Sequence, residues 1–540
     1  MPDRGGVAVG AEERPARPLP GDLTAEEHRI LAYASAIGSE FDFQLLVAAM
    51  AANEEELAEQ LETLVHRGIL TERLGGDRFA FKEEEFRARI YRSLTESRLR
   101  VLHRKIAEAL ESIRPGPPPE LFADLGRHYF LGKVTAKSLE YNRRAGERAR
   151  AADEPERAIH HFERVLLDLA TQPESHAAEE AAITEVLGDL YYSVGNFASA
   201  DRYYGQALEK AGNQDPSLRA RLLLARSEIA RDNLAGEAAA RGALEARRLF
   251  SAAGDAVGVA KTHQLMARLA FQRGDFPGSL DENMYALELL EGNRDPRLIG
   301  RLAIELGNSF AMLGADVKPI AIDWYERAIL MLRSVSDWLE LSRAYHNLAV
   351  AIGEAHPQDG LDYLAKAREA ADRGHDPRSA GWALLTGVEM RLALGQMDES
   401  ERDNEQAFRL LQRLADPLGL EQVELNRGEI AERRGQWEDA ERGYSGAVER
   451  CRKFGLGADE AEAQFRLARL RSKVRDWSGA REAFLQAERL GLPEVRPNLA
   501  KAFADLKQTW TWRTARRRLP HRRTTRPTTH HYKARAGFNS

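Results

Sequence analysis

The sequence predicts an all-α protein: a solenoid of helical hairpins preceded by a small domain of helices with a β-hairpin. A pair of one large residue followed by a small one recurs at intervals of about 40 residues from position 187 onward. After each pair comes a short turn and then a segment with small residues at helical spacing, so each unit predicts two antiparallel helices. The region before residue 112 lacks this repeat and contains short β-prone runs around glycines instead.

The composition is that of a folded helical chain. Among 540 residues, 30% are charged and 43% are hydrophobic, which is far from the composition of disordered proteins. Cys451 is the only cysteine, which excludes an intrachain disulfide and indicates a reducing compartment. The sequence has no apolar run long enough to span a membrane and no hydrophobic signal region. We therefore expect a cytoplasmic protein without a membrane partner, with a flexible leader over residues 1–21.

The charge is distributed unevenly along the chain. The formal net charge is -6, but residues 506–540 contain ten Lys or Arg and no Asp or Glu, so the rest of the chain is acidic. Residues 512–540 are rich in Arg, Thr, His and Pro and predict a basic disordered tail. Such a tail would bind nucleic acid or an acidic surface. The sequence leaves open the alternative that this terminus is unselected or misread and has no function.

The first organised domain is predicted over residues 22–112 and begins with three helices. Thr24 and Glu27 have the spacing of a capping box at the start of the first helix. Leu57, Leu61 and Leu64 give the third helix one apolar face. The three predicted helices cover residues 24–36, 43–50 and 53–68. A turn of Gly75, Gly76 and Asp77 then separates two short runs, 69–73 and 78–81, and predicts a β-hairpin.

Three helices followed by a hairpin wing form a winged helix. The stretch 23–111 resembles the winged-helix segment that closes the ATPase module of STAND-type, maltose-regulator-like signalling ATPases, just before their tetratricopeptide arm. The matching segments are 23–27, 37–42, 61–70 and 90–110. The resemblance implies a winged helix that leads into a repeat arm.

The nucleotide chemistry of that family is not expected here. The sequence has no G-x-x-x-x-G-K-[ST] motif, and the lone Gly132-Lys133 pair is followed by Val134. Family members often have Phe-x-His after the wing, where this chain has Phe81, Lys82 and Glu83. A glutamate at that place would repel phosphate, so no cofactor is predicted.

The predicted third helix also argues against DNA binding by this domain. It is the usual groove reader of a winged helix, yet it carries glutamates at positions 54, 55, 56, 59 and 62. Acidic side chains oppose the attraction to phosphate that dominates DNA affinity. Nucleic acid is therefore expected as a partner only through the basic tail.

The stretch 183–208 is the most complete repeat unit. It contains Leu187 and Gly188 in the first helix, a turn at Gly195, and Ala200 and Tyr204 in the second helix. Comparable first-helix pairs occur at 266–267, 306–307, 348–349, 427–428 and 467–468. This pattern resembles the tetratricopeptide repeat (TPR) family, with about six residues more per unit than the usual length. Repeats of that length resemble those of kinesin light chains and spindle-orientation adaptors.

We predict that the solenoid covers residues 119–492. It comprises eight units of about 40 residues from residue 181, after an imperfect first unit with helices over 120–131, 138–151 and 155–170. A terminal helix over 494–510, within a capping segment 493–511, is expected to cover the last unit with Leu499, Phe503 and Leu506. A solenoid requires such a cap because its end units would otherwise expose apolar surface.

The first helices are predicted to line a concave wall, and six residues on it are candidates for peptide binding. An asparagine amide can give a peptide backbone one donor and one acceptor. Asparagines grip peptides in this way in the adaptor-like relatives, and the resemblance implies the same here. The candidates are Arg268, Asn308, Arg343, Asn347, Trp382 and Asn426. The alternative is that they are solvated polar residues on an unused wall.

No catalytic or metal-binding constellation is predicted. His160 and His161 are adjacent and lack a third ligand at metal spacing, and no base is implied near Cys451. The sequence therefore predicts a non-enzymatic scaffold or signalling adaptor that binds a peptide or partner domain. Two alternatives stay open: the regulatory arm of a STAND-type ATPase or kinase system acting in trans, and a transcription regulator that uses the winged helix.

Overall fold

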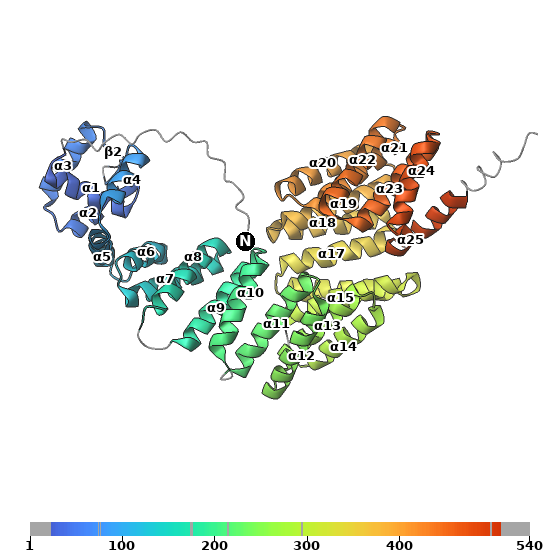
Figure 1. Cartoon of the computed structure of the whole chain (residues 1–540), viewed down its shortest axis with the longest axis horizontal. Helices are drawn as coiled ribbons and strands as arrows, with labels where there is room; N and C mark the ends of the chain where they lie inside the picture. Colours follow the sequence, from blue (N-terminus) through green and yellow to red (C-terminus); the bar gives the residue numbers. More distant parts are fainter. Residues whose placement is uncertain are drawn as a thin grey trace, which may run out of the picture. The chain divides into compact units, whose positions relative to one another are not determined.

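The computed structural model describes residues 23–508 apart from a few positions in loops, which are 74, 76, 173–175, 213–214, 293–294 and 497–498. The predicted leader, 1–21, and the predicted basic tail, 512–540, lie outside the described residues. Helices joined as antiparallel hairpins make up nearly all of the described chain, which confirms the predicted fold class (Figure 1). The chain forms two compact units, Met1–Leu265 and Met266–Ser540.

The elements are as follows in chain order. The first unit contains α1 (Ala25–Ile37), β1 (Glu40–Asp42), α2 (Phe43–Met50), α3 (Glu54–His66), β2 (Leu70–Glu72), β3 (Arg78–Phe81), α4 (Glu84–Ser93), α5 (Glu96–Ile113), the short 3-10 helix η1 (Pro119–Leu121), α6 (Phe122–Leu131), α7 (Thr135–Ala151), α8 (Pro155–Leu169), α9 (Ala177–Ser193), α10 (Phe197–Ala211), α11 (Pro216–Asp232) and α12 (Gly236–Ala253). The division between the units falls within α13 (Ala256–Gln272). The second unit contains α14 (Phe276–Leu289), α15 (Pro296–Leu313), η2 (Ala315–Val317), α16 (Lys318–Ser334), α17 (Trp338–Gly353), α18 (Pro357–Arg373), α19 (Pro377–Ala393), α20 (Met397–Arg413), α21 (Pro417–Arg433), α22 (Trp437–Phe454), α23 (Gly457–Lys473), α24 (Trp477–Arg489) and α25 (Leu492–Val495).

The three N-terminal helices and the hairpin are present within two residues of their predicted bounds. The capping box is confirmed, because the Glu27 amide donates to Thr24 Oγ1 at 3.1 Å and the Thr24 amide donates to Glu27 Oε2 at 2.7 Å. A third strand, β1, was not predicted. It pairs antiparallel with β3, which gives the sheet order β1-β3-β2. At three residues β1 is too short to show an alternating pattern, but its Phe41 is buried against Phe79.

A buried polar network joins this domain to α6. Arg127 donates to the carbonyl of Ile37 at 2.7 Å and contacts His128 Nε2 at 2.9 Å. Because the guanidinium can only donate, His128 Nε2 accepts and the neutral ring carries its proton on Nδ1. That nitrogen lies 2.8 Å from His103 Nδ1, so His103 accepts there and donates from Nε2 to the Tyr91 hydroxyl at 2.9 Å. Burial and the nearby Arg127 lower the pKa of His103 to about 4, which keeps the network in this neutral state.

Close contacts between glycine and tyrosine hold three of the hairpins together. A Cβ atom on Gly188, Gly307 or Gly428 would lie 2.4 to 2.5 Å from a ring atom of the tyrosine in the second helix of the same hairpin. These tyrosines are Tyr204, Tyr325 and Tyr444, which are nearly fully buried. Only glycine leaves room for the ring at this distance, so packing explains the glycine of these three marker pairs.

The glycine and tyrosine hairpins recur every third hairpin. They are α9/α10, α15/α16 and α21/α22, about 120 residues apart, with two other hairpins between. Helices α14 and α20 differ at the two positions that Ala200 and Tyr204 occupy in α10. Serine replaces the alanine and asparagine replaces the tyrosine, giving Ser279 and Asn283 in α14 and Ser400 and Asn404 in α20. The structural period of the solenoid is therefore three hairpins, and the sequence repeats of about 40 residues are subdivisions of it.

Asn283 provides a direct test of this packing. It is fully buried, and neither atom of its amide has a hydrogen-bond partner among the described residues. Replacing it with leucine is expected to raise the free energy of unfolding by about 1–3 kcal/mol, because a desolvated amide without partners is removed at similar volume. Thermal unfolding followed by circular dichroism measures the change.

Asn142 is the matched control for Asn283. It is equally buried, but its amide donates to the Gly126 carbonyl at 3.0 Å, and its Oδ1 lies 2.9 Å from His161 Nδ1. The same substitution to leucine at this position is expected to lower the unfolding midpoint. Equal losses from both substitutions would contradict the interpretation of Asn283.

The C-terminal end differs from the prediction in its continuity. The prediction of a single helix over 494–510 is wrong, because α25 ends at Val495 and a second helical segment covers 500–508. Pro497 explains the break, since proline has no amide proton and disfavours helical geometry at the residue before it. The expected covering contacts are present: Phe503 is buried and stacks on Phe484 with ring centroids 4.3 Å apart. Leu499 and Leu506 pack against the same cluster.

Candidate interaction surface on the first helices

Within the second unit, the first helices of successive hairpins form one continuous surface, which we call the inner wall. Helix α15 contacts α17, α17 contacts α19, and α19 contacts α21. An ion pair between Glu429 and Arg466 joins α21 to α23. The members of the wall used below are Arg301, Glu305, Asn308, Arg343, Asn347, Val350, Trp382, Glu389, Asn426, Glu429, Glu462 and Arg466. Because first helices approach one another in this way, the wall corresponds to the surface predicted to bind a peptide.

Asn308 and Asn347 are brought together, as the prediction for a shared site requires. Asn347 Nδ2 donates to Asn308 Oδ1 at 2.8 Å, and the Tyr325 hydroxyl donates to the same oxygen at 2.8 Å. These bonds leave Asn308 Nδ2 as a donor and Asn347 Oδ1 as an acceptor, with no hydrogen bond to either atom among the described residues. Neither atom is buried. The pair therefore still offers one donor and one acceptor on adjacent helices.

The two predicted arginines have partners within the wall. Arg268 Nε donates to Glu305 Oε1 at 2.8 Å, from α13 to α15. Arg343 is exposed, and its Nη1 lies 3.3 Å from Glu340 Oε1 on the same helix. Arg268 therefore links neighbouring helices, while Arg343 remains accessible to a partner.

Trp382 and Asn426 are less accessible than predicted. Trp382 is half-buried and packs against the apolar cluster that contains Leu384 and Leu385. Asn426 has only 2% of its surface exposed; its Oδ1 accepts from Gln422 Nε2 at 3.0 Å, and its Nδ2 has no partner among the described residues. A peptide reaches the Asn426 amide only if surrounding side chains move, so the structure does not bring this residue into one exposed site with Asn308 and Asn347.

A ladder of alternating charges crosses the C-terminal part of the wall. Arg433 donates to the Leu392 carbonyl at 3.0 Å and pairs with Glu429 at 2.9 Å. Arg466 pairs with Glu429 at 2.8 Å and with Glu462 at 2.8 Å. Beyond the last hairpin, Arg496 Nε pairs with Glu462 Oε2 at 3.1 Å. The ladder thus links α19, α21, α23 and the C-terminal segment, and its members satisfy one another.

Glu389 on α19 is an exposed carboxylate on this part of the wall that has no ion pair or hydrogen bond among the described residues. Its side chain is exposed, yet the surrounding wall removes enough water to raise its pKa, an effect that Glu429 and Glu462 reinforce and Arg466 opposes. An acid in such a place is stabilised by any cation that approaches it. Glu389 is therefore the strongest candidate on the wall for binding a basic side chain.

Sequence reasoning missed the ion pairs that join wall residues of neighbouring repeat units. Wall residues 34 to 41 positions apart bind each other, as Arg268 does with Glu305 and Arg466 with Glu429. The signal was present in the sequence, because opposite charges recur at nearly the repeat spacing. Only the register of the units decides which of these charges meet.

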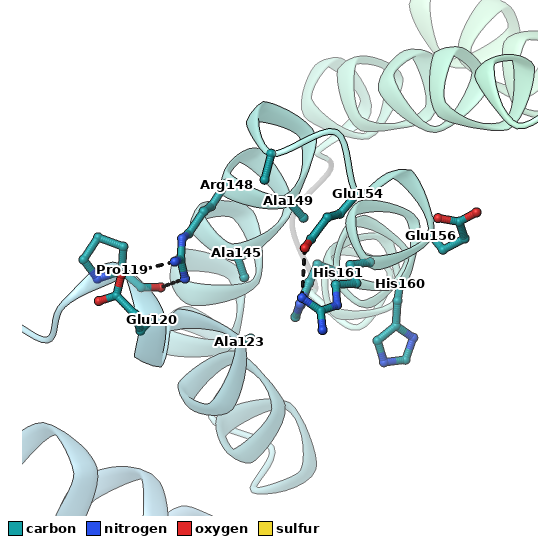
Figure 2. Close-up of a pocket in the computed structure, with 12 residues that line it drawn as sticks. Pro119, Glu120, Ala123, Ala145, Arg148, Ala149, Glu154, Glu156, His160 and His161 are labelled. Carbon is teal, nitrogen blue, oxygen red and sulfur yellow. Dashed lines mark hydrogen bonds and ion pairs between the residues drawn. The ribbon is translucent and has the colours of Figure 1, made fainter. Parts of the chain in front are cut away.

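Surface grooves occur elsewhere on the solenoid, but they follow from its geometry. One groove in the first unit has a volume of about 580 Å³ and lies where α6 and α8 flank α7, with Ala145 and Ala149 on its floor (Figure 2). Arg148 crosses its edge and donates to the Pro119 carbonyl at 3.0 Å. Grooves over α11 and over α21 are built in the same way, between two helices that flank a third. A hollow that recurs in this manner does not by itself mark a site.

The described residues contain no group of three His, Cys, Asp or Glu side chains placed to hold a metal ion. Within the same residues, no helix combines the length and the apolar character needed to cross a membrane. Cys451 is buried, and burial together with nearby acidic groups raises the pKa of its thiol to about 12, which disfavours the thiolate.

Comparison with known proteins finds similarity in fold only. No family model matches the chain, and no curated protein matches it. Among solved structures, it is similar to a STAND protein with a tetratricopeptide repeat sensor from Pyrococcus horikoshii, with a TM-score of 0.46 and 14% identity over 82% of this chain and 66% of that one. It is also similar to a Rap protein complexed with competence and sporulation factor, with a TM-score of 0.41 and 14% identity over 71% of this chain and 94% of that one.

A third similarity is to a putative kinesin light chain from Podosopora anserina with TPR-like repeats, with a TM-score of 0.31 and 12% identity over 37% of this chain and 97% of that one. These solved structures include TPR-like helical repeat proteins. The fold of this chain is a tetratricopeptide-type solenoid of helical hairpins, as its own helix order and helix contacts show. The chain spans just under two thirds of the STAND protein.

Proposed function

We propose that this protein is a non-enzymatic interaction scaffold whose inner wall binds an extended peptide segment of a partner. The observation that carries the proposal is the Asn308 and Asn347 pair, which keeps one free donor and one free acceptor on adjacent first helices. A peptide group presents one acceptor and one donor, so the pair matches one backbone unit of an extended segment. We also propose a cytoplasmic location, which the single cysteine favours because it fits a reducing compartment.

The neighbouring wall residues define the side chains that such a segment would carry. Val350 follows Asn347 by one helical turn and is 49% exposed, so it offers an apolar contact beside the amide pair. Glu389 lies on the next first helix without an ion pair. We therefore propose a partner segment with an apolar residue near the gripped backbone and a lysine or arginine that reaches Glu389.

Selection from a random peptide library against the full-length chain tests this proposal. Selected peptides are expected to be enriched in basic residues, and Asn308→Ala with Asn347→Ala is expected to weaken their binding by tenfold or more, because two hydrogen bonds to the backbone are lost. Glu389→Gln is expected to weaken binding most for the basic peptides. Fluorescence polarisation with labelled peptides measures each affinity.

Gln358→Ala is the matched control. Gln358 also presents an amide, but it lies exposed on α18, a second helix, away from the inner wall. Its substitution is expected to leave the affinities unchanged. Peptides that bind the double asparagine variant as tightly as the unaltered chain would place the site elsewhere.

We assign the N-terminal domain as a winged helix that has a packing or protein-contact role. Support comes from α1 to α3 followed by the β2–β3 hairpin in a three-stranded sheet. The glutamates of α3 at positions 54, 55, 56, 59 and 62 are exposed, which opposes binding to DNA phosphates. This arrangement favours the scaffold over a transcription regulator.

A further inference from the structure

A cluster of three cations that form no ion pair among the described residues lies at one end of the α6–α8 groove. On α6, Arg127 follows the groove residue Ala123 by four positions, and on α8, Arg164 follows His160 by four. Residues four apart share one helix face, so Arg127 and Arg164 lie one helical turn beyond Ala123 and His160, two residues that line the groove in Figure 2. Lys133 lies just past the end of α6.

Phe130 brings two of these cations together. The guanidinium of Arg164 lies over the Phe130 ring at 5.5 Å from its centroid, and Lys133 Nζ lies over the same ring at 4.8 Å. Two positive groups on one aromatic ring are drawn to its π-electrons, but they repel each other. The arrangement concentrates positive charge at a half-buried position.

The acidic groups nearby do not neutralise this charge. Arg164 is half-buried, and it has no hydrogen bond and no ion pair in the described part of the chain. Asp168, four residues further on α8, is buried and bonds to Ser138. Lys133 and Arg164 lie near enough to oppose the rise in its pKa that burial causes, but within the described residues it forms no ion pair with either. Burial and the neighbouring Arg127 lower the pKa of Arg164, whereas Asp168 opposes that shift without cancelling it.

Arg127 also contacts only neutral groups. Its guanidinium donates to the Ile37 carbonyl and to neutral His128, as described above. Lys133 has no ion pair either within the described residues. Three cations, two of them half-buried, exceed the charge of the nearby Asp168, which is costly for a folded protein unless an anion joins them.

We propose that the cluster of Arg127, Lys133 and Arg164 binds an oxyanion, either a carboxylate or a phosphate, carried by a peptide segment that lies in the α6–α8 groove. Guanidinium groups bind both oxyanions through charge-assisted hydrogen bonds. The floor of small side chains, including Ala145 and Ala149, leaves room for a main chain close to α7. This site lies in the first unit and is separate from the inner wall, so it adds a second binding surface to the scaffold.

Titration of the full-length chain with inorganic phosphate, followed by 31P line broadening, tests the proposal. Chloride at equal ionic strength controls for screening. Phosphate is expected to show saturable binding, and Arg164→Gln is expected to weaken that binding by tenfold or more. Arg157→Gln is the matched control, because Arg157 lines the same groove but is exposed and paired with Glu154 at 2.9 Å. The Arg157→Gln variant is expected to bind phosphate with nearly unchanged affinity.

Thermal unfolding distinguishes a binding role from a structural role for Arg164. In chloride alone, Arg164→Gln is expected to leave the unfolding midpoint unchanged or to raise it, because a repelled guanidinium is removed. Phosphate is expected to raise the midpoint of the unaltered chain by a few degrees but not that of Arg164→Gln. Absence of saturable phosphate binding, equal binding by Arg164→Gln, or a lower midpoint of this variant in chloride would overturn the proposal. Competition by acetate identifies the source: equal competition indicates a carboxylate, and preference for phosphate indicates a phosphorylated side chain.

Discussion

Replacing Glu421 with glutamine is expected to stabilise the protein at pH 8.5 and to change little at pH 5. Glu421 lies on α21 with 3% of its surface exposed, and its Oε1 has no hydrogen-bond partner among the described residues. Burial raises its pKa from 4.5 to about 8, and the nearby Asp459 and Glu462 add to the effect against the opposing Arg466 and Arg496. Glutamine keeps the shape of the protonated side chain without its charge.

The sign of the pH dependence follows from proton binding. Between pH 4.5 and 8 the native state holds the proton of Glu421 and the unfolded state does not, so the free energy of unfolding falls as the pH rises through this window. Each unit of pKa difference corresponds to about 1.4 kcal/mol, so the accumulated loss above pH 8 is on the order of a few kcal/mol. Glu421→Gln removes this loss. Unfolding midpoints measured from pH 5 to 9 are expected to separate steadily as the pH rises.

Glu424→Gln on the same helix is the control for this prediction. Glu424 is paired with Arg427 at 3.0 Å, so its charge is favourable in the native state. Its substitution is expected to lower the unfolding midpoint slightly or to leave it unchanged at pH 8.5. The unfolding midpoints of Glu421→Gln and of the unaltered chain are compared from pH 5 to 9. A constant difference between them would show that Glu421 does not carry a raised pKa.

The charged residues of the ladder on the inner wall have a common structural role. Glu429, Arg466 and Glu462 link α21 to α23, and Arg496 continues the series into the C-terminal segment. These pairs are partly buried, and as a connected network they fix the register of neighbouring helices. The ladder reaches α19, the helix that carries Glu389. For the proposed binding of an extended segment, a fixed α19 lowers the entropic cost of presenting Glu389.

The fold could be predicted because its signals are local and repeated. The pair Leu187 and Gly188 and the tyrosine sixteen residues after the glycine reflect one packing contact, and the contact recurs wherever the pattern recurs. The strand β1 was missed because three residues carry no period. The break at Arg496 was missed because the apolar spacing of Leu499, Phe503 and Leu506 continues past Pro497, although the proline itself was visible.

The candidate site was predicted only in part. The sequence placed Asn308 and Asn347 on adjacent first helices, and the structure joins them by a hydrogen bond. It could not show that Asn426 is buried or that Arg268 is engaged by Glu305, because both depend on how neighbouring units meet. Repeat patterns identify which face a residue occupies, whereas the partner on that face is decided by tertiary contacts.

Two glycine substitutions in one hairpin are expected to change stability in opposite directions. Gly188→Ala would place a Cβ atom 2.4 Å from Cε1 of Tyr204, so either the ring or α9 must shift. Overpacking of this kind costs about 1–3 kcal/mol, and moving the ring also disturbs the 2.7 Å bond from the Tyr204 hydroxyl to Asp189. Gly205 lies within α10, where a Cβ atom would meet nothing within 4 Å.

Gly205→Ala is therefore expected to stabilise the protein by about 0.5–1 kcal/mol, because alanine loses less backbone entropy than glycine in a helix. The two substitutions add the same methyl group to helices of the same hairpin, so helix propensity predicts a gain for both and only packing predicts a loss at Gly188. Thermal unfolding of the two variants separates these effects. A gain at both positions would mean that the glycine and tyrosine contact does not hold the hairpin, and that the repeat marker reflects something other than close packing.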